Sequence, residues 1–247
     1  MNLIVDIGNS LLKVAVMHLG QELYSTQYAD VREFNTTELL ATYPQIERAI
    51  VASSGVSTAP IAAMLREQGL WVLEMTPLTP VPIGNHYQSP ETLGVDRLAA
   101  AVGAVKVLGY DDCLIVDFGT AITIDLVRGG AFCGGNISPG VRSRFRSLHD
   151  YTQRLPMCEP TDDILDVGQT TRQAIEQGVM QGITNEIEGY IKAFIDKNAK
   201  ILLIFTGGDA IFFVNRIKNA IFAKCNLVLC GLNTILDYNA SIENQFD

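Results

Sequence analysis

A six-residue pattern occurs twice in this chain of 247 residues, and it constrains the fold more than any other feature. The segment Leu3–Gly8 (LIVDIG) recurs as Leu114–Gly119 (LIVDFG). Each copy is an apolar run that ends in Asp-x-Gly, which is typical of a buried strand with a carboxylate at its tip and a tight turn at the glycine. The repeat predicts a duplicated α/β chain with domains 1–110 and 111–247, divided in the turn-rich stretch Gly109–Asp112.

Similar elements follow the two copies. Each half is predicted to open with a meander of three strands and to continue with helices, in the order β-β-β-α-β-α. The strands expected after the first copy are Lys13–Met17 and Glu22–Tyr28, those after the second are Ile122–Val127 and one that begins at Ala131, and the helices expected in the first half are Ala59–Gln68 and Gly94–Leu108.

The second half contains a long amphipathic pattern over Thr171–Ile195, with isoleucine or valine at every fourth position from Ile175. Small residues at 174, 178 and 182 form a ridge on a neighbouring face, which suits either internal helix packing or a subunit interface. The elements expected after this helix are a strand Ile201–Phe205, a helix Asp209–Ile221, a strand Leu227–Cys230 and a last short helix.

Composition excludes several classes of protein. A net charge of −9 and a pI near 4.8 argue against nucleic-acid binding and against a polybasic membrane anchor. No apolar run reaches the ~18 residues of a membrane helix, and the start of the sequence lacks the pattern of a signal peptide. The five cysteines have no CxxC spacing and predict neither disulfides nor zinc. We therefore expect a cytoplasmic protein with no nucleic-acid or membrane partner.

The two Asp-x-Gly turns have the residue types of a polyphosphate clamp. Glycine at 8 and 119 lets backbone N–H groups approach phosphate oxygens, and carboxylates at the strand tips can hold cations that offset phosphate charge. A single such turn is often only a matter of backbone geometry, but the matched pair favours function. The candidate phosphate-binding residues of the two turns are Asp6, Gly8, Asn9, Ser10, Lys13, Gly119 and Thr120, and Asp117 is a candidate cation ligand.

A third element, Thr206-Gly207-Gly208, lies between an apolar strand and a predicted helix. It is either an adenosine-binding turn, where glycine lets a nucleoside lie against the backbone, or an ordinary connection. The order of two phosphate loops and a strand-Gly-Gly turn resembles the actin-like superfamily of acetate and sugar kinases and chaperone ATPases. That resemblance implies two duplicated ribonuclease H-like domains with a nucleotide cleft between them.

A closer resemblance rests on motifs spread through nearly the whole chain. These are Asp6–Ser10 (DIGNS), Tyr87–Arg97 (YQSPETLGVDR), Asp117–Asp125 (DFGTAITID), Gly134–Gly140 (GGNISPG) and Thr206–Gly208. Together they are similar to the type III pantothenate kinase family. Ser10 stands where the family often has threonine, which keeps the hydroxyl group.

The resemblance implies an ATP-dependent kinase that converts pantothenate to 4'-phosphopantothenate, the first step of coenzyme A synthesis. It implies that Asp96 is the general base and that Arg97 binds either the pantothenate carboxylate or the transferring phosphoryl group. The other substrate residues implied are Tyr87, Gly94, Val95 and, from a neighbouring subunit of a homodimer, Thr171, with Thr170 as the alternative register. The implied cations are Mg²⁺ near Asp6 and potassium or ammonium at Asp117.

Two other functions are compatible with parts of the sequence. The phosphate loops alone would suit another actin-like kinase that acts on a sugar or a carboxylate. A nucleotide-binding regulator without turnover would also keep the fold. The segment Gly94–Arg97 and the presence of Asp96 favour the pantothenate kinase.

Overall fold

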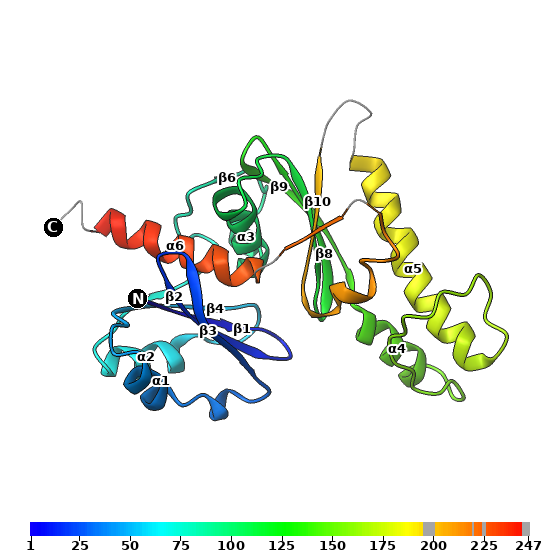
Figure 1. Ribbon diagram of the computed structural model, residues 1–247, viewed down its shortest axis with the longest axis horizontal. Helices are drawn as coiled ribbons and strands as arrows, with labels where there is room; N and C mark the ends of the chain where they lie inside the picture. The colour runs from blue at the N-terminus through cyan, green and yellow to red at the C-terminus, as the bar shows by residue number, and fades with distance from the viewer. Residues whose placement is uncertain (195–200, 219, 224–225, 244–247) are drawn as a thin grey trace. The chain divides into compact units, whose positions relative to one another are not determined.

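The computed structural model describes residues 1–194, 201–218, 220–223 and 226–243 of the chain, which form two compact units (Figure 1). The first unit contains Met1–Asp111, the short segment Gly130–Phe132 and the C-terminal helix. The second unit contains Asp112–Gly129 and the residues from Cys133 to the last strand. The repeat alone would count the C-terminal helix with the second half, and the division into duplicated domains at residue 110 stays a prediction.

The sheet of the first unit has the strand order β3-β2-β1-β4-β5. Strand β1 is at its centre, antiparallel to β2 and parallel to β4, and all six of its residues are buried. This burial on both faces explains why the strand is a continuous apolar run. The strands are β1 (Asn2–Ile7), β2 (Leu12–His18), β3 (Gln21–Tyr28), β4 (Arg48–Ser53) and β5 (Trp71–Glu74), and the predicted meander is confirmed.

Helices of the first unit begin where polar or proline residues allow. Asn35 accepts a hydrogen bond from the Glu38 N–H and so caps α1, and Pro60 occupies the first turn of α2. The predicted helix 94–108 forms as α3 followed by the π-helical turn η3. The elements are η1 (Val31–Glu33), α1 (Thr36–Thr42), α2 (Ala59–Glu67), η2 (Pro90–Thr92), α3 (Val95–Val102) and η3 (Gly103–Val107).

The strand predicted over Leu227–Cys230 is wrong, because these residues begin the long helix α6 (Leu227–Glu243). Asn226 caps this helix with its side-chain oxygen and its carbonyl. Helix α6 packs directly on α3, and a Cβ added to Gly231 would lie 1.8 Å from the carbonyl oxygen of Ala99. A short apolar run is ambiguous between a buried strand and a buried helix, and here the contact with α3 decides.

The sheet of the second unit repeats the arrangement of the first. Strand β7 is antiparallel to β8 and parallel to β10, as β1 is to β2 and β4. Each unit therefore has a carboxylate near the tip of a strand between one antiparallel and one parallel neighbour. The strands are β7 (Cys113–Phe118), β8 (Ala121–Arg128), β9 (Ala131–Pro139), β10 (Leu202–Thr206) and β11 (Ala220–Phe222). The strands predicted at 122–127, from 131 and at 201–205 are confirmed, whereas β11 was not predicted.

Helices α4 (Val141–Asp150) and α5 (Thr171–Phe194) contribute to the core of the second unit. The predicted amphipathic helix is confirmed as α5, which buries Ile175, Val179, Ile183 and Ile187, while residue 195 lies outside the described residues. Within the described ranges, no helix combines the length and the apolar composition that a bilayer-crossing segment needs.

The helix predicted over Asp209–Ile221 is wrong. Only the short helix η4 (Gly208–Phe212) forms, followed by a turn in which the N–H of Ile217 donates to the Phe213 carbonyl. The ring of Phe213 stacks on that of Phe118, with the ring centres 4.7 Å apart, and the chain then forms β11, parallel to β10. Anchoring of the aromatic ring and pairing of the edge strand outweigh the local helical pattern.

Candidate functional site

The first predicted phosphate loop is a tight turn between β1 and β2. The N–H of Gly8 donates to the Leu11 carbonyl at 3.0 Å, and a Cβ at this glycine would lie 3.1 Å from the same oxygen. Asn9 and Ser10 follow on the exposed side of the turn. The loop thus presents neutral polar groups beside a buried strand tip, which suits an anionic ligand.

Asp6, Lys13 and Asp96 lie close together although they are far apart in the sequence. Asp6 is directly opposite Lys13 in the β1–β2 pairing and is only 6% exposed. Burial is the main cause that raises the pKa of Asp6 to about 6; the Lys13 ammonium lowers it in part, and the nearby Asp96 carboxylate raises it further. Two carboxylates that interact electrostatically within one unit are candidates for holding a cation.

Asp96 is held at the first turn of α3. The backbone N–H of Arg97 donates to Asp96 Oδ1 at 2.9 Å, and the N-terminal end of a helix favours a negative charge. A Cβ added to Gly94 would lie 2.6 Å from that same oxygen, so the glycine leaves the room that the carboxylate occupies. The sequence Gly-Val-Asp-Arg therefore fixes the direction of one acidic group.

Arg97 is almost completely buried, with 5% of its surface exposed, and it lies beside two aromatic rings. Its guanidinium carbon is 5.7 Å from the ring centre of Tyr87 and 5.6 Å from that of Phe132. The structure thus brings Tyr87 and Arg97 together within the first unit, and Val95 begins the helix that carries Arg97. The motifs gave no signal for Phe132, because it follows a hairpin turn outside all of them.

The second phosphate loop and the Gly-Gly turn are neighbours within the second unit. Asp117 pairs with Thr123 of β8 on one side and with Thr206 of β10 on the other. Gly207 has φ +92°, in the region that favours glycine, and a Cβ there would lie 2.4 Å from Asp117 Oδ1. This position thus requires glycine both for its backbone conformation and for its approach to the carboxylate.

The segment Gly134–Gly140 packs against the same loop. The N–H of Gly140 donates to the carbonyl of Thr120 at 3.1 Å, and a Cβ on Gly140 would lie 2.3 Å from the Gly119 carbonyl. Gly135 has similar close contacts with Asp125, which is 1% exposed. The glycines of the motif therefore support the backbone of the loop.

Some residues near this loop were not predicted. Asp209, directly after the Gly-Gly turn, has a side chain that is 17% exposed, and burial raises its pKa. Arg142 of α4 lies 3.9 Å from it and pairs with Glu159 at 2.7 Å. The acidic residue directly after Gly-Gly could have indicated from the sequence that Asp209 lies near this loop. Thr171 lies exposed at the start of α5 in this unit.

The described residues contain no group of three or more His, Cys, Asp or Glu side chains arranged to hold a metal ion. Mg²⁺ commonly keeps waters and is held by one or two carboxylates together with substrate phosphates. The carboxylates fit a cation that arrives with a nucleotide.

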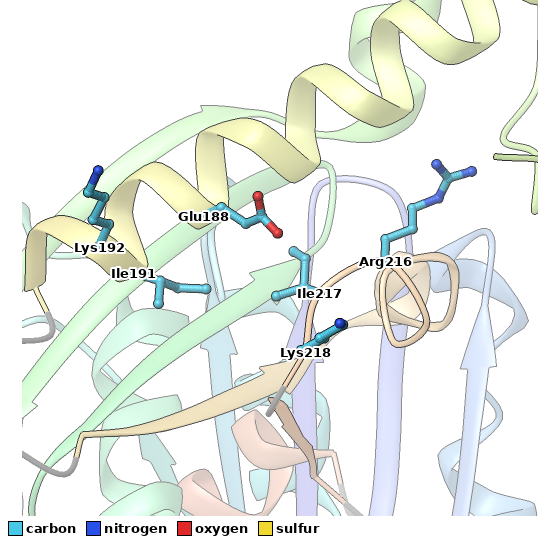
Figure 2. Close-up of a pocket in the computed structure, with 6 residues that line it drawn as sticks. All are labelled: Glu188, Ile191, Lys192, Arg216, Ile217 and Lys218. Carbon is cyan, nitrogen blue, oxygen red and sulfur yellow. The ribbon is translucent and has the colours of Figure 1, made fainter. Parts of the chain in front are cut away.

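A separate hollow of about 400 Å³ lies between α5 and the turn before β11 in the second unit (Figure 2). The Glu188 carboxylate points toward Ile217, whereas the ammonium of Lys192 points away from it. Charged side chains of both signs line the hollow. The lining residues are Glu188, Ile191, Lys192, Arg216, Ile217 and Lys218, and none belongs to the predicted site.

Comparison with known proteins identifies the family. The family model for type III pantothenate kinase matches residues 2–193. The chain belongs to the type III pantothenate kinase family. It is 41% identical over 241 residues to a type III pantothenate kinase of Phocaeicola vulgatus, covering 97% of this chain and 99% of that protein. A type III pantothenate kinase of Bacteroides fragilis is 40% identical over 240 residues, covering 97% and 98% of the two chains.

Solved structures agree on the fold of this type III pantothenate kinase family member. A Campylobacter jejuni protein of the Baf family of transcriptional activators is 25% identical with a TM-score of 0.62, covering 97% of this chain and 99% of that one. The activator of 2-hydroxyisocaproyl-CoA dehydratase from Clostridium difficile, with bound ADPNP, has a TM-score of 0.56 at 11% identity, covering 98% and 97%. The chain has the α/β actin-like ATPase fold.

The raised pKa of Asp6 predicts a pH-dependent stability. The usual pKa is 3.8 and the folded value about 6, so the folded chain binds more protons between these pH values and loses stability as the pH rises through them. We expect Asp6→Asn to match the native chain near pH 4 and to be more stable above pH 7, by up to about 3 kcal/mol. Denaturant unfolding in EDTA at both pH values measures the difference.

Glu67→Gln, on the exposed surface of α2, serves as the control and should not alter the pH profile. An Asp6→Asn protein that is less stable than the native chain at pH 7.5 would show that the buried carboxylate is stabilising and would contradict the prediction.

Proposed function

We propose that this chain transfers the γ-phosphoryl group of ATP to the primary hydroxyl of pantothenate, with Asp96 as the general base. Membership of the type III pantothenate kinase family is the observation that supports this reaction. The observation that supports the residue assignment is that Asp96 and Asp6 interact electrostatically within the first unit, although they are 90 positions apart. A cytoplasmic location is part of the proposal, since ATP is the co-substrate.

Binding of ATP is assigned to the residues of the two turns and the Gly-Gly element. Backbone N–H groups at Gly8 and Gly119, with the side chains of Asn9, Ser10 and Thr120, would bind phosphate oxygens, and Lys13 would add a positive charge. The actin-like fold supports this, because a neighbour of the same fold has ADPNP bound. Thr206, Gly207 and Gly208 would lie against the nucleoside.

Two cations are part of the proposal. Asp6 would hold Mg²⁺, and Asp117 would hold potassium or ammonium. When bound, such cations neutralise the negative charge of the phosphates. The raised pKa of Asp6 supports its assignment, because a carboxylate that is costly to ionise alone gains most from a nearby cation.

Asp96 would accept the proton of the pantothenate hydroxyl as that oxygen attacks the γ-phosphorus in line. The hydrogen bond from the Arg97 N–H and the helix terminus keep the carboxylate in one orientation, so that little reorganisation is needed in the reaction. Arg97, with its guanidinium beside Tyr87, would bind the carboxylate of pantothenate or the transferring phosphoryl group. Gly94 and Val95 would complete the wall of the pocket.

A kinase assay tests this mechanism. The purified chain with ATP, Mg²⁺ and potassium should phosphorylate pantothenate, and Asp96→Asn should lower kcat about 100-fold or more, since it removes the base. Replacement of potassium by sodium should lower the rate. The exposed variant Glu67→Gln should keep native rates. Turnover of a sugar instead, or tight ATP binding without any turnover, would favour another kinase or a regulator.

Substitutions at the two glycines of the Gly-Gly turn distinguish a loss of ATP binding from a loss of stability. A Cβ added to Gly208 would meet no atom within 4 Å, so we expect Gly208→Val to keep the native thermal stability and to raise the KM for ATP roughly tenfold by filling space proposed for the nucleoside. The KM for pantothenate should stay within about twofold. Gly207→Ala should instead lower the melting temperature, because its Cβ would press on Asp117. A native KM for ATP in Gly208→Val would remove the adenosine assignment.

A homodimer through α5 is also proposed. The helix packs its isoleucine face into the core, while a Cβ added to Gly178 or Gly182 would meet no atom within 4 Å of the described structure. The small-residue ridge is therefore open to close packing by another helix. Ile164 and Val167, in the segment before α5, are 57% and 75% exposed and add apolar surface. Thr171 of one subunit would then reach the pantothenate site of the other.

Disruption of the ridge tests the dimer. Gly178→Glu places a charge on the surface proposed to be closely packed, so we expect sedimentation to change from dimer to monomer and pantothenate turnover to fall. A charge reversal on α2, Glu67→Lys, should leave the dimer intact. Thr171→Val should keep the dimer and raise the KM for pantothenate. A native chain that sediments as a monomer while fully active would overturn this part of the proposal.

A further inference from the structure

Phe132 is the second aromatic neighbour of Arg97, and it comes from a distant part of the sequence. It lies at the start of β9, after the hairpin turn Gly129-Gly130, and is completely buried. Its ring centre is 5.6 Å from the guanidinium carbon of Arg97 and 5.9 Å from the ring centre of Tyr87, with the two rings inclined at 61°. The guanidinium thus lies beside two aromatic rings that also contact each other.

The position of Phe132 is fixed by backbone pairing with the segment that carries Tyr87. Strand β6 (Gly84–Asn85) runs parallel to the start of β9, with Asn85 opposite Phe132, and the N–H of His86 donates to the Phe132 carbonyl at 2.8 Å. The side-chain oxygen of Asn85 accepts the N–H of Tyr87 at 3.0 Å. One short pairing therefore sets the places of both rings.

Close packing keeps this pairing in register. A Cβ added to Gly84 would lie 2.8 Å from the Cβ of Ala131, so the two strands approach more closely than other residues would allow. The N–H of Gly130 donates to the carbonyl of Asp111 at 3.0 Å and anchors the turn. Gly130–Phe132 belongs to the first unit, whereas β9 continues from Cys133 in the second.

We propose that Phe132 is a positioning residue for substrate binding: with Tyr87 it holds the guanidinium of Arg97 in the orientation that binds the anionic group of the substrate. Aromatic faces attract a guanidinium electrostatically, and the attraction is stronger where water is excluded, as at a side chain that is 5% exposed. A planar guanidinium held beside two rings loses little freedom when its remaining N–H groups bind a carboxylate. The inference rests on the proposed role of Arg97.

A substitution that removes the ring and keeps an apolar side chain tests the proposal. Phe132→Leu should raise the KM for pantothenate about tenfold and leave kcat and the KM for ATP within about twofold, because only the orientation of a binding group changes. Phe132→Tyr keeps the aromatic face and should restore most of the affinity. The control is Phe34→Leu, another buried aromatic of the first unit, which packs on Tyr28. It should lower the melting temperature without a change in the KM for pantothenate.

A double-mutant cycle with Arg97→Met, which removes the positive charge and keeps a long side chain, identifies the route of the effect. If Phe132 acts through the guanidinium, Phe132→Leu should change the KM for pantothenate by less than about twofold when Arg97 is already methionine. Equal effects in both backgrounds, or a Phe132→Leu protein that behaves like Phe34→Leu, would overturn the positioning role. Failure of the native chain to phosphorylate pantothenate would instead contradict the proposed function, so the two failures are distinguishable.

Discussion

The burial of a carboxylate at the tip of a central strand is the constraint around which the candidate site of the first unit is built. Asp6 is exposed to only 6% of its surface, beside a second acid, and folding alone would favour its protonated form. The Lys13 ammonium across the strand pair offsets only part of this cost. In the proposed function, this loss of stability at neutral pH is the cost of a carboxylate that can hold a cation, and such a relation between stability and activity is common at functional sites.

In the second unit, the residues around the strand-tip carboxylate are mainly glycines that allow close backbone contacts, whereas in the first unit charged side chains surround it. Gly140 and Gly207 bring backbone segments into direct contact with the turn after β7, and in each case a Cβ would lie within 2.5 Å of an oxygen atom. These contacts join three motifs that are separated by up to 90 positions into one layer around Asp117. The spacing of the motifs in the sequence therefore reflects packing requirements as much as ligand chemistry.

Local pattern predicted most of the fold. The apolar runs that end in Asp-x-Gly form β1 and β7, and the segment with isoleucine or valine at every fourth position forms α5. Two predicted elements are wrong. The short apolar run Leu227–Cys230 is helical because α6 packs on α3. The segment after Asp209 forms a turn because Phe213 stacks on Phe118 and β11 pairs with β10. In such places, contacts between distant segments decide the secondary structure, and a window of ten residues does not contain these contacts.

By itself the sequence determined the duplicated strand-turn pattern, the family, and the residue types at the candidate site, because strand periodicity, turn chemistry and motif spacing are properties of neighbouring residues. Only the tertiary structure decided that Asp96 interacts with Asp6, that Gly207 lies against Asp117, and that Phe132 lies beside Arg97. These are relations between side chains on separate elements. Their energies depend on distance and burial in space, which the order of residues along the chain does not contain.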